Sequence, residues 1–125
     1  MSEASAGGKQ VVLVVDDDDL VRRVVRAVLE ADDYVVVEAA NGAQALEAAA
    51  ANQPVVIVLD VMMPGIDGVD VCRQVDHGSV KVLMLTARDD LDTEDASRAA
   101  GADDFLGKPF SSIELLEHVN KLVDA

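Results

Sequence analysis

Residues 11–29 read VVLVVDDDDLVRRVVRAVL. The first five are four valines and a leucine, an apolar run that is typical of a buried strand. The last ten place apolar residues every three or four positions, which is the period of an amphipathic helix. Four consecutive aspartates separate the two patterns. The stretch therefore predicts a strand, an acidic turn and a helix, which together form a first βα unit.

The same alternation continues along the chain. Apolar runs predict four more strands, the last of them weak, at residues 34–37, 55–59, 80–85 and 105–106. Helical patterns follow these runs over residues 42–51, 67–75, 91–100 and 111–123. Asn41 and Ser111 are suited to cap helix N-termini, and Gly101 is suited to end a helix. Only residues 76–79 lie between the third helical pattern and the fourth strand, so we expect a trimmed third helix or exit loop.

This order, βαβαβαβαβα, predicts an α/β fold. Continuous apolar strands that alternate with helices indicate a parallel sheet covered on both faces, with right-handed crossovers. No linker-like segment interrupts residues 10–125, so we expect one domain there, preceded by a flexible, polar segment over residues 1–9. In such a sheet, ligands bind beyond the carboxyl ends of the strands.

Charge limits the classes of partner. The 125 residues include 24 acidic and 10 basic ones, a net charge of −14. This charge repels phosphate backbones and anionic lipid, so we expect no direct binding to nucleic acid or membranes. The apolar run 11–15 is too short for a signal peptide or a membrane span, which favours a cytoplasmic protein. Cys72, the single cysteine, is expected to be a small core residue.

Polar side chains follow several of the predicted strands at their carboxyl ends. They are Asp16 and Asp17 after the first strand, Asp60 after the third, Thr86 after the fourth and Lys108 after the fifth. If the first and third strands are neighbours, three carboxylates converge, and such charges need a cation or raised pKa values. Oxygen ligands without His or Cys fit Mg²⁺ better than Ca²⁺ when room is left for water and phosphate.

A carboxylate beside Mg²⁺ can also attack phosphorus and form an aspartyl phosphate. The Lys108 ammonium and the Thr86 hydroxyl have the chemistry to hold the oxygens of the transferred group. Each residue also has an ordinary alternative: an exposed surface lysine for Lys108 and a strand-end threonine for Thr86. For Asp18 and Asp19, a solvated acidic loop is the preferred interpretation.

Four segments of the chain resemble the signature segments of a response-regulator receiver domain. They are VVLVVDDDDL (11–20), VIVLDVMMPGIDG (56–68), VLMLTAR (82–88) and GADDFLGKPF (101–110). The resemblance covers essentially residues 10–123. It implies a doubly wound five-stranded sheet with strand order 2-1-3-4-5.

The resemblance also implies roles for individual residues. Asp60 would accept a phosphoryl group, and Mg²⁺ would be bound by Asp17, Asp60 and the Met62 backbone carbonyl, with Asp16 acting through water. Thr86, the Ala87 amide and Lys108 would hold phosphoryl oxygens, and Lys108-Pro109 would be a cis peptide bond. Phe105 would be the switch aromatic that responds to Thr86. Met62 and Arg88 would flank the opening through which water reaches the phosphoryl group.

The implied function is that of a phosphoacceptor in a two-component or phosphorelay pathway. The donor would be a histidine kinase or a histidine phosphotransfer protein, and the downstream output is not identified by the sequence. The surface formed by helix four, strand five and helix five would carry the signal. The only chemistry would be self-catalysed phosphotransfer and autodephosphorylation. The acidic segment 89–95 lacks the mixed charges of dimerising winged-helix regulators, so we expect a monomer or weak dimer.

One alternative from another class is a Mg²⁺-dependent phosphatase of the haloacid-dehalogenase type. Its nucleophile would be Asp16, the first acid of a DxD pair with Asp18. That family places an acidic pair after its lysine, whereas Asp103 and Asp104 precede Lys108. Elsewhere, the arginines of the first helix are expected to form a solvated face, with docking of an acidic partner as the alternative.

Overall fold

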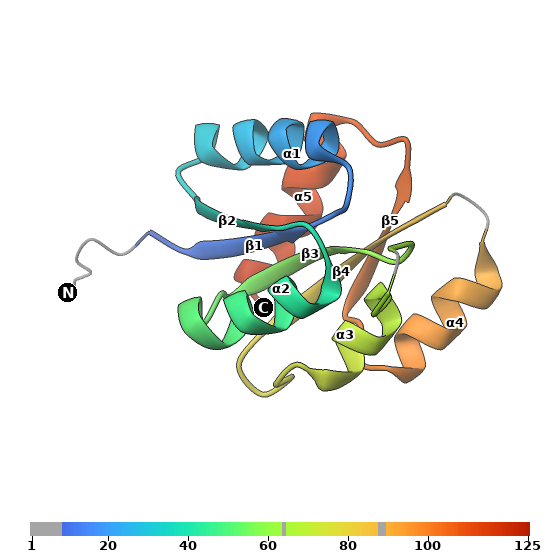
Figure 1. The fold of residues 1–125 in the computed structure, drawn as a ribbon. Helices are drawn as coiled ribbons and strands as arrows, with labels where there is room; N and C mark the ends of the chain where they lie inside the picture. Colours follow the sequence, from blue (N-terminus) through green and yellow to red (C-terminus); the bar gives the residue numbers. More distant parts are fainter. Residues whose placement is uncertain (1–8, 64, 88–89) are drawn as a thin grey trace.

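The computed structural model describes residues 9–63, 65–87 and 90–125, which form one five-stranded parallel sheet with helices on both faces (Figure 1). The strand order β2-β1-β3-β4-β5 confirms the predicted fold class and topology. The strands are β1 Val11–Val15, β2 Val35–Ala39, β3 Val56–Asp60, β4 Lys81–Ala87 and β5 Asp104–Lys108. The helices are α1 Asp19–Ala31, α2 Gly42–Asn52, α3 Gly68–Gln74, α4 Leu91–Ala99 and α5 Ser112–Val123.

Alternating side chains of the strands build two hydrophobic cores. Val12 and Val14 of β1 face α1 and α5, while Leu13 and Val15 face the opposite layer of α2, α3 and α4. All four side chains are fully buried, as are Val56 to Leu59 of β3. Both faces of the central strands are therefore covered, which explains why their sequences are apolar without interruption.

The strand register brings the carboxyl ends of β1, β3, β4 and β5 to one edge. Val15 pairs with Leu59, Asp60 with Leu85 and Ala87 with Lys108. The residues that directly follow or end these strands are therefore neighbours, although they are far apart in the sequence.

Most helix starts agree with the sequence. Asn41 caps α2, and Ser111 forms a full capping box with Glu114 at α5. Gly101 follows α4 with a φ of 106°, a conformation that a side chain would strain. The third helix, α3, has seven residues and is shorter than the predicted range 67–75. Asp18 is exposed, as expected for a solvated acidic loop, but it also has a structural role. Its carboxylate accepts hydrogen bonds from the amides of Leu20 and Val21 and so caps α1.

Gly68 allows α3 to begin directly against the end of β3. A Cβ at this position would lie 2.3 Å from the Asp60 carbonyl oxygen and 2.8 Å from the Val61 Cα. A larger residue would push the start of α3 away from Asp60.

Two further expectations concern the chain as a whole. Cys72 is fully buried, and burial raises the pKa of its thiol to about 11, which confirms a core role for this residue. Among the described helices, none combines the length and apolar character that crossing a bilayer requires. The division into a segment 1–9 and a domain 10–125 stays a prediction, because residues 1–8 lie outside the described part.

Candidate functional site

Three carboxylates gather where β1 and β3 end. One oxygen from each of Asp16, Asp17 and Asp60 lies within 4.8 Å of the others. Asp16 and Asp60 are 1% and 5% exposed, whereas Asp17 faces solvent. The convergence expected from neighbouring first and third strands is therefore present.

Lys108 is the counter-charge at this cluster. Its ammonium nitrogen lies 3.0 Å from Asp16 Oδ2 and 3.4 Å from Asp60 Oδ1, and its side chain is 33% exposed. Burial works against the Lys108 charge, but the two carboxylates outweigh it and raise the pKa of the ammonium. The lysine is thus part of the cluster and not an exposed surface residue.

The surroundings of Asp60 disfavour its ionisation. Burial, followed by the nearby charge of Asp16, raises the pKa of Asp60 to about 6, against the opposing effect of Lys108. The Met62 amide donates to Asp60 Oδ1 over 3.2 Å and adds a smaller stabilisation of the charged form. The single positive charge of Lys108 therefore does not balance the negative charges of the buried Asp16 and Asp60 and the exposed Asp17.

The donor set fits a hard divalent cation. Carboxylate oxygens dominate the cluster, and such ligands suit hard cations such as Mg²⁺, Ca²⁺ and Mn²⁺. A divalent ion would also supply the positive charge that Lys108 alone does not. The exposed Asp17 leaves one side of the cluster open to water, which Mg²⁺ retains readily.

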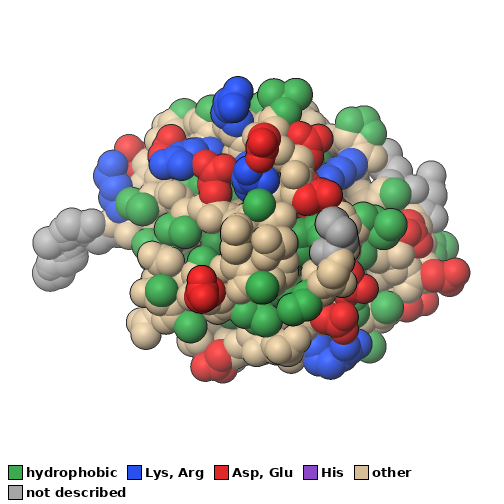
Figure 2. Space-filling view, in the orientation of Figure 1, with side chains coloured by type: hydrophobic (Ala, Val, Ile, Leu, Met, Phe, Trp, Pro, Cys, Tyr) green, Lys and Arg blue, Asp and Glu red, His purple; other side chains and the backbone are tan. Residues whose placement is uncertain are grey.

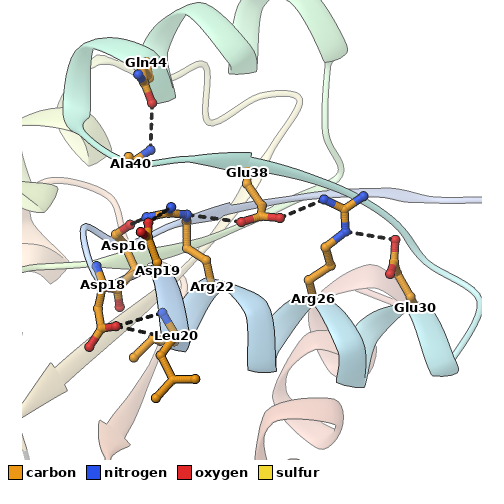
Figure 3. Close-up of polar contacts among 11 residues, drawn as sticks. Asp16, Asp18, Asp19, Leu20, Arg22, Arg26, Glu30, Glu38, Ala40 and Gln44 are labelled. Atoms are coloured by element: carbon orange, nitrogen blue, oxygen red, sulfur yellow. Dashed lines mark hydrogen bonds and ion pairs between the residues drawn. The ribbon is translucent and has the colours of Figure 1, made fainter.

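The turn that begins at Asp16 is held by several hydrogen bonds (Figure 3). The Asp18 amide donates to Asp16 Oδ1 over 2.9 Å, and the Asp16 amide donates to the Ala39 carbonyl over 3.2 Å. Arg22 of α1 donates from Nη1 to the Asp16 carbonyl over 2.6 Å. The local sequence thus supplies the acids and two of these contacts, while strand β2 supplies the third.

The remaining predicted residues that the structure describes lie on β4 and β5. Thr86 is 3% exposed, and Ala87 pairs in register with Lys108. The Lys108-Pro109 bond is cis, as the resemblance implied. Phe105 is half-buried, and the Arg98 guanidinium lies over its ring at 4.7 Å from the centroid. Arg88, which is expected with Met62 at the opening through which water reaches the phosphoryl group, lies outside the described residues.

The two histidines and the arginines of α1 do not join the cluster. His77 lies 2.6 Å from the Cys72 carbonyl, and His118 lies 2.6 Å from the Asp104 carboxylate. Arg22 and Arg26 do not form a simple solvated face, because both bind Glu38 of β2. The cap at Asp18 had a sequence signal, an Asp just before a helical pattern, but the pairing with Glu38 had none.

Comparisons with known proteins agree on one family. The family model described as "Response regulator receiver domain" matches residues 12–120. "Response regulator MprA" of Mycobacterium ulcerans (strain Agy99) is 46% identical over 104 residues, which is 82% of this chain and 45% of that protein. The M. leprae (strain TN) protein of the same name is 45% identical over 104 residues, 82% of this chain and 46% of its own length. The chain thus spans about half the length of these curated relatives.

Solved structures give the same result. The chemotaxis protein CheY4 of Vibrio cholerae superposes with a TM-score of 0.86 at 32% identity, covering 92% of this chain and 99% of that one. A putative response regulator from Chloroflexus aurantiacus J-10-fl gives 0.87 at 37% identity, covering 94% and 99%.

The haloacid-dehalogenase alternative is not supported. The relatives and structures named above carry the names of response regulators or of a chemotaxis protein. Asp18, the second acid that the alternative requires, is used as the cap of α1. The chain belongs to the family of response regulator receiver domains.

Proposed function

We propose that Asp60 is the residue of this receiver domain that accepts the phosphoryl group. Receiver domains are the phosphoacceptor modules of two-component signalling, and this chain is one of them. The observation that carries the assignment is the position of Asp60, buried at the end of β3 beside Asp16 and in contact with Lys108. We further propose that Mg²⁺ is held by Asp17, Asp60 and the Met62 carbonyl, with Asp16 acting through water.

When bound, Mg²⁺ would neutralise the acidic cluster and the charge of an incoming phosphoryl group. Among the chain's own groups, Lys108 would pair with one phosphoryl oxygen, while the Thr86 hydroxyl and the Ala87 amide would donate to others. Lys108 and Thr86 sit on adjacent, paired strands, and Thr86 follows the residue that pairs with Asp60, so both lie at the same edge of the sheet as Asp60.

In the proposed reaction, an Asp60 carboxylate oxygen attacks the phosphorus of a phosphohistidine. A P–O bond forms to Asp60 as the P–N bond breaks, and the departing imidazole keeps the electron pair and takes a proton from water. Water later attacks the aspartyl phosphate, which releases inorganic phosphate and regenerates the carboxylate. No separate substrate is turned over, so the chemistry is self-catalysed phosphotransfer and autodephosphorylation.

The partners follow from the family. We propose a histidine kinase or a histidine phosphotransfer protein as donor and a cytoplasmic location for the exchange. The longer relatives support a further, unidentified output segment or protein. Phosphorylation would draw Thr86 towards the phosphoryl group and allow Phe105 to move, which would change the surface of α4, β5 and α5.

A stoichiometric labelling experiment tests the proposal. The protein is incubated with Mg²⁺ and a small phosphodonor, and its intact mass is followed over time. We expect one phosphoryl group per chain in the wild type and in Asp70→Asn, whose side chain is exposed on α3. Asp60→Asn should stay unlabelled, and continuous multiple turnover of the donor without a labelled chain would contradict the proposal.

A further inference from the structure

Arg22 is an unusual arginine for a helix at the protein surface. It projects from α1 beside the acidic cluster, yet its side chain is only 13% exposed. Its guanidinium donates to the Asp16 carbonyl over 2.6 Å and to Glu38 Oε1 over 3.1 Å, and it also contacts the Asp19 carboxylate. The residue thus links the turn after β1, the start of α1 and strand β2 (Figure 3).

Glu38 is itself held in place, which fixes the direction of the arginine. Arg26 Nη1 lies 2.7 Å from Glu38 Oε2, and Arg26 Nε lies 3.1 Å from Glu30. The hydrogen bond from Arg26 lowers the pKa of Glu38, and Arg22 adds to this effect against burial. Glu38 therefore stays ionised and keeps both arginines bound. In Figure 2, basic and acidic side chains lie next to one another on the upper part of the face shown.

The atom that Arg22 binds explains what the contact achieves. The Asp16 carbonyl belongs to the peptide group that joins Asp16 to Asp17, so orienting it orients both residues. The buried Asp16 carboxylate and the exposed Asp17 carboxylate belong to the residues that this peptide joins, and each places one oxygen within 4.8 Å of the other. Without a cation their mutual repulsion, and that with Asp60, would push the turn outwards. A charged donor on the carbonyl opposes that movement without entering the cluster.

We propose that Arg22 is a positioning residue that sets the spacing of Asp16 and Asp17 for a divalent cation. The proposal rests on the proposed Mg²⁺ role of this cluster and assigns to Arg22 no contact with the ion or the phosphoryl group. Outer residues that orient metal ligands commonly change metal affinity about 10- to 100-fold when they are replaced.

The direction in which Mg²⁺ affinity changes when Arg22 is replaced distinguishes a positioning role from a purely electrostatic one. Arg22 carries a positive charge close to a site for a positive ion. If it acted only through its charge, removing it would tighten Mg²⁺ binding. If it acts by holding the Asp16 carbonyl, removing it weakens binding, although the local charge becomes more negative. Arg22→Lys retains the charge and loses the planar fork that reaches both the carbonyl and Glu38, so it too should weaken binding.

The test is a Mg²⁺ titration of the full chain followed by the amide resonances of Asp17 and Met62. We expect the apparent Kd for Mg²⁺ to rise about tenfold in Arg22→Met and by a smaller factor in Arg22→Lys. Arg23→Met is the matched control, since Arg23 is the next residue on α1 and is exposed. It removes the same charge and should leave the Kd unchanged or lower it. Resonances of β3 and β4 in the metal-free spectra verify that each variant is folded.

The outcomes distinguish this inference from the proposed function. Unchanged or tighter Mg²⁺ binding in folded Arg22→Met would overturn the positioning role and leave the phosphoacceptor proposal intact. If Arg22→Met does not fold, Arg22→Lys decides by the same criterion. Absence of any Mg²⁺ response at Asp17 in the wild type would instead overturn the metal assignment on which both depend.

Discussion

The raised pKa of Asp60 predicts that the negative charge on this carboxylate, which the proposed phosphotransfer requires, destabilises the metal-free fold. Burial and Asp16 raise this pKa from the ordinary 3.8 to about 6. The folded state therefore binds the Asp60 proton more tightly than the unfolded chain does. This contribution to stability is fully present below about pH 4 and is lost as the pH rises through about 6.

The shift sets the size of the effect. About two pH units at 1.36 kcal/mol each give roughly 3 kcal/mol between the neutral and ionised forms of Asp60 at neutral pH. Asparagine resembles the neutral form, so Asp60→Asn should exceed the wild type in unfolding free energy. Part of the stabilisation from the Asp60 proton is already lost at pH 5. We therefore expect the difference in unfolding free energy between Asp60→Asn and the wild type to grow by roughly 1 to 1.5 kcal/mol between about pH 5 and pH 7.5.

The assay is urea unfolding followed by circular dichroism, with a metal chelator present throughout. Comparing the two proteins at each pH removes the general repulsion of a chain whose net charge is −14. Saturating Mg²⁺ should close most of the gap at neutral pH, since it binds the wild-type cluster more strongly. A gap that is equal at both pH values, or a less stable Asp60→Asn at neutral pH, would refute the reasoning.

Three further predictions concern metal, lifetime and packing. Millimolar Mg²⁺ should raise the wild-type melting temperature modestly, and more at neutral than at acidic pH, because protonated carboxylates bind it poorly; an unchanged melting temperature would count against the metal assignment. Met62→Asn should shorten the life of the aspartyl phosphate, measured by loss of label, because an amide can orient water and a thioether cannot; an equal or longer lifetime would show that this side chain does not control water. Gly68→Ala should lower the unfolding free energy by about 2 kcal/mol or more, since its Cβ would lie 2.3 Å from the Asp60 carbonyl oxygen; urea unfolding that matches the wild type would show that α3 shifts at little cost.

The sequence predicts features that depend on chain order and strand ends. Alternating apolar runs and helical patterns determine the α/β fold, and the convergence of Asp16 and Asp60 follows once β1 and β3 are adjacent. The N-caps at Asn41 and Ser111 follow from local chemistry that involves only three or four residues.

Other features depend on side-chain directions that no local pattern records. Arg22 and Glu38 are sixteen positions apart and lie on different elements, so their contact requires the packed position of α1 against β2. The contact of Arg98 with Phe105 likewise depends on how α4 meets β5. Asp18 is a different case, because a helix cap was available in the sequence and the run of four acids favoured a solvated loop instead.

The most direct test of the account is to map the phosphorylated side chain itself. The protein is labelled by a small phosphodonor with Mg²⁺ and reduced with borohydride, which converts an aspartyl phosphate to homoserine, and its peptides are then sequenced by mass spectrometry. The account predicts homoserine at position 60 and none at positions 16 and 17. Homoserine at position 16 with Asp60 unmodified would contradict it.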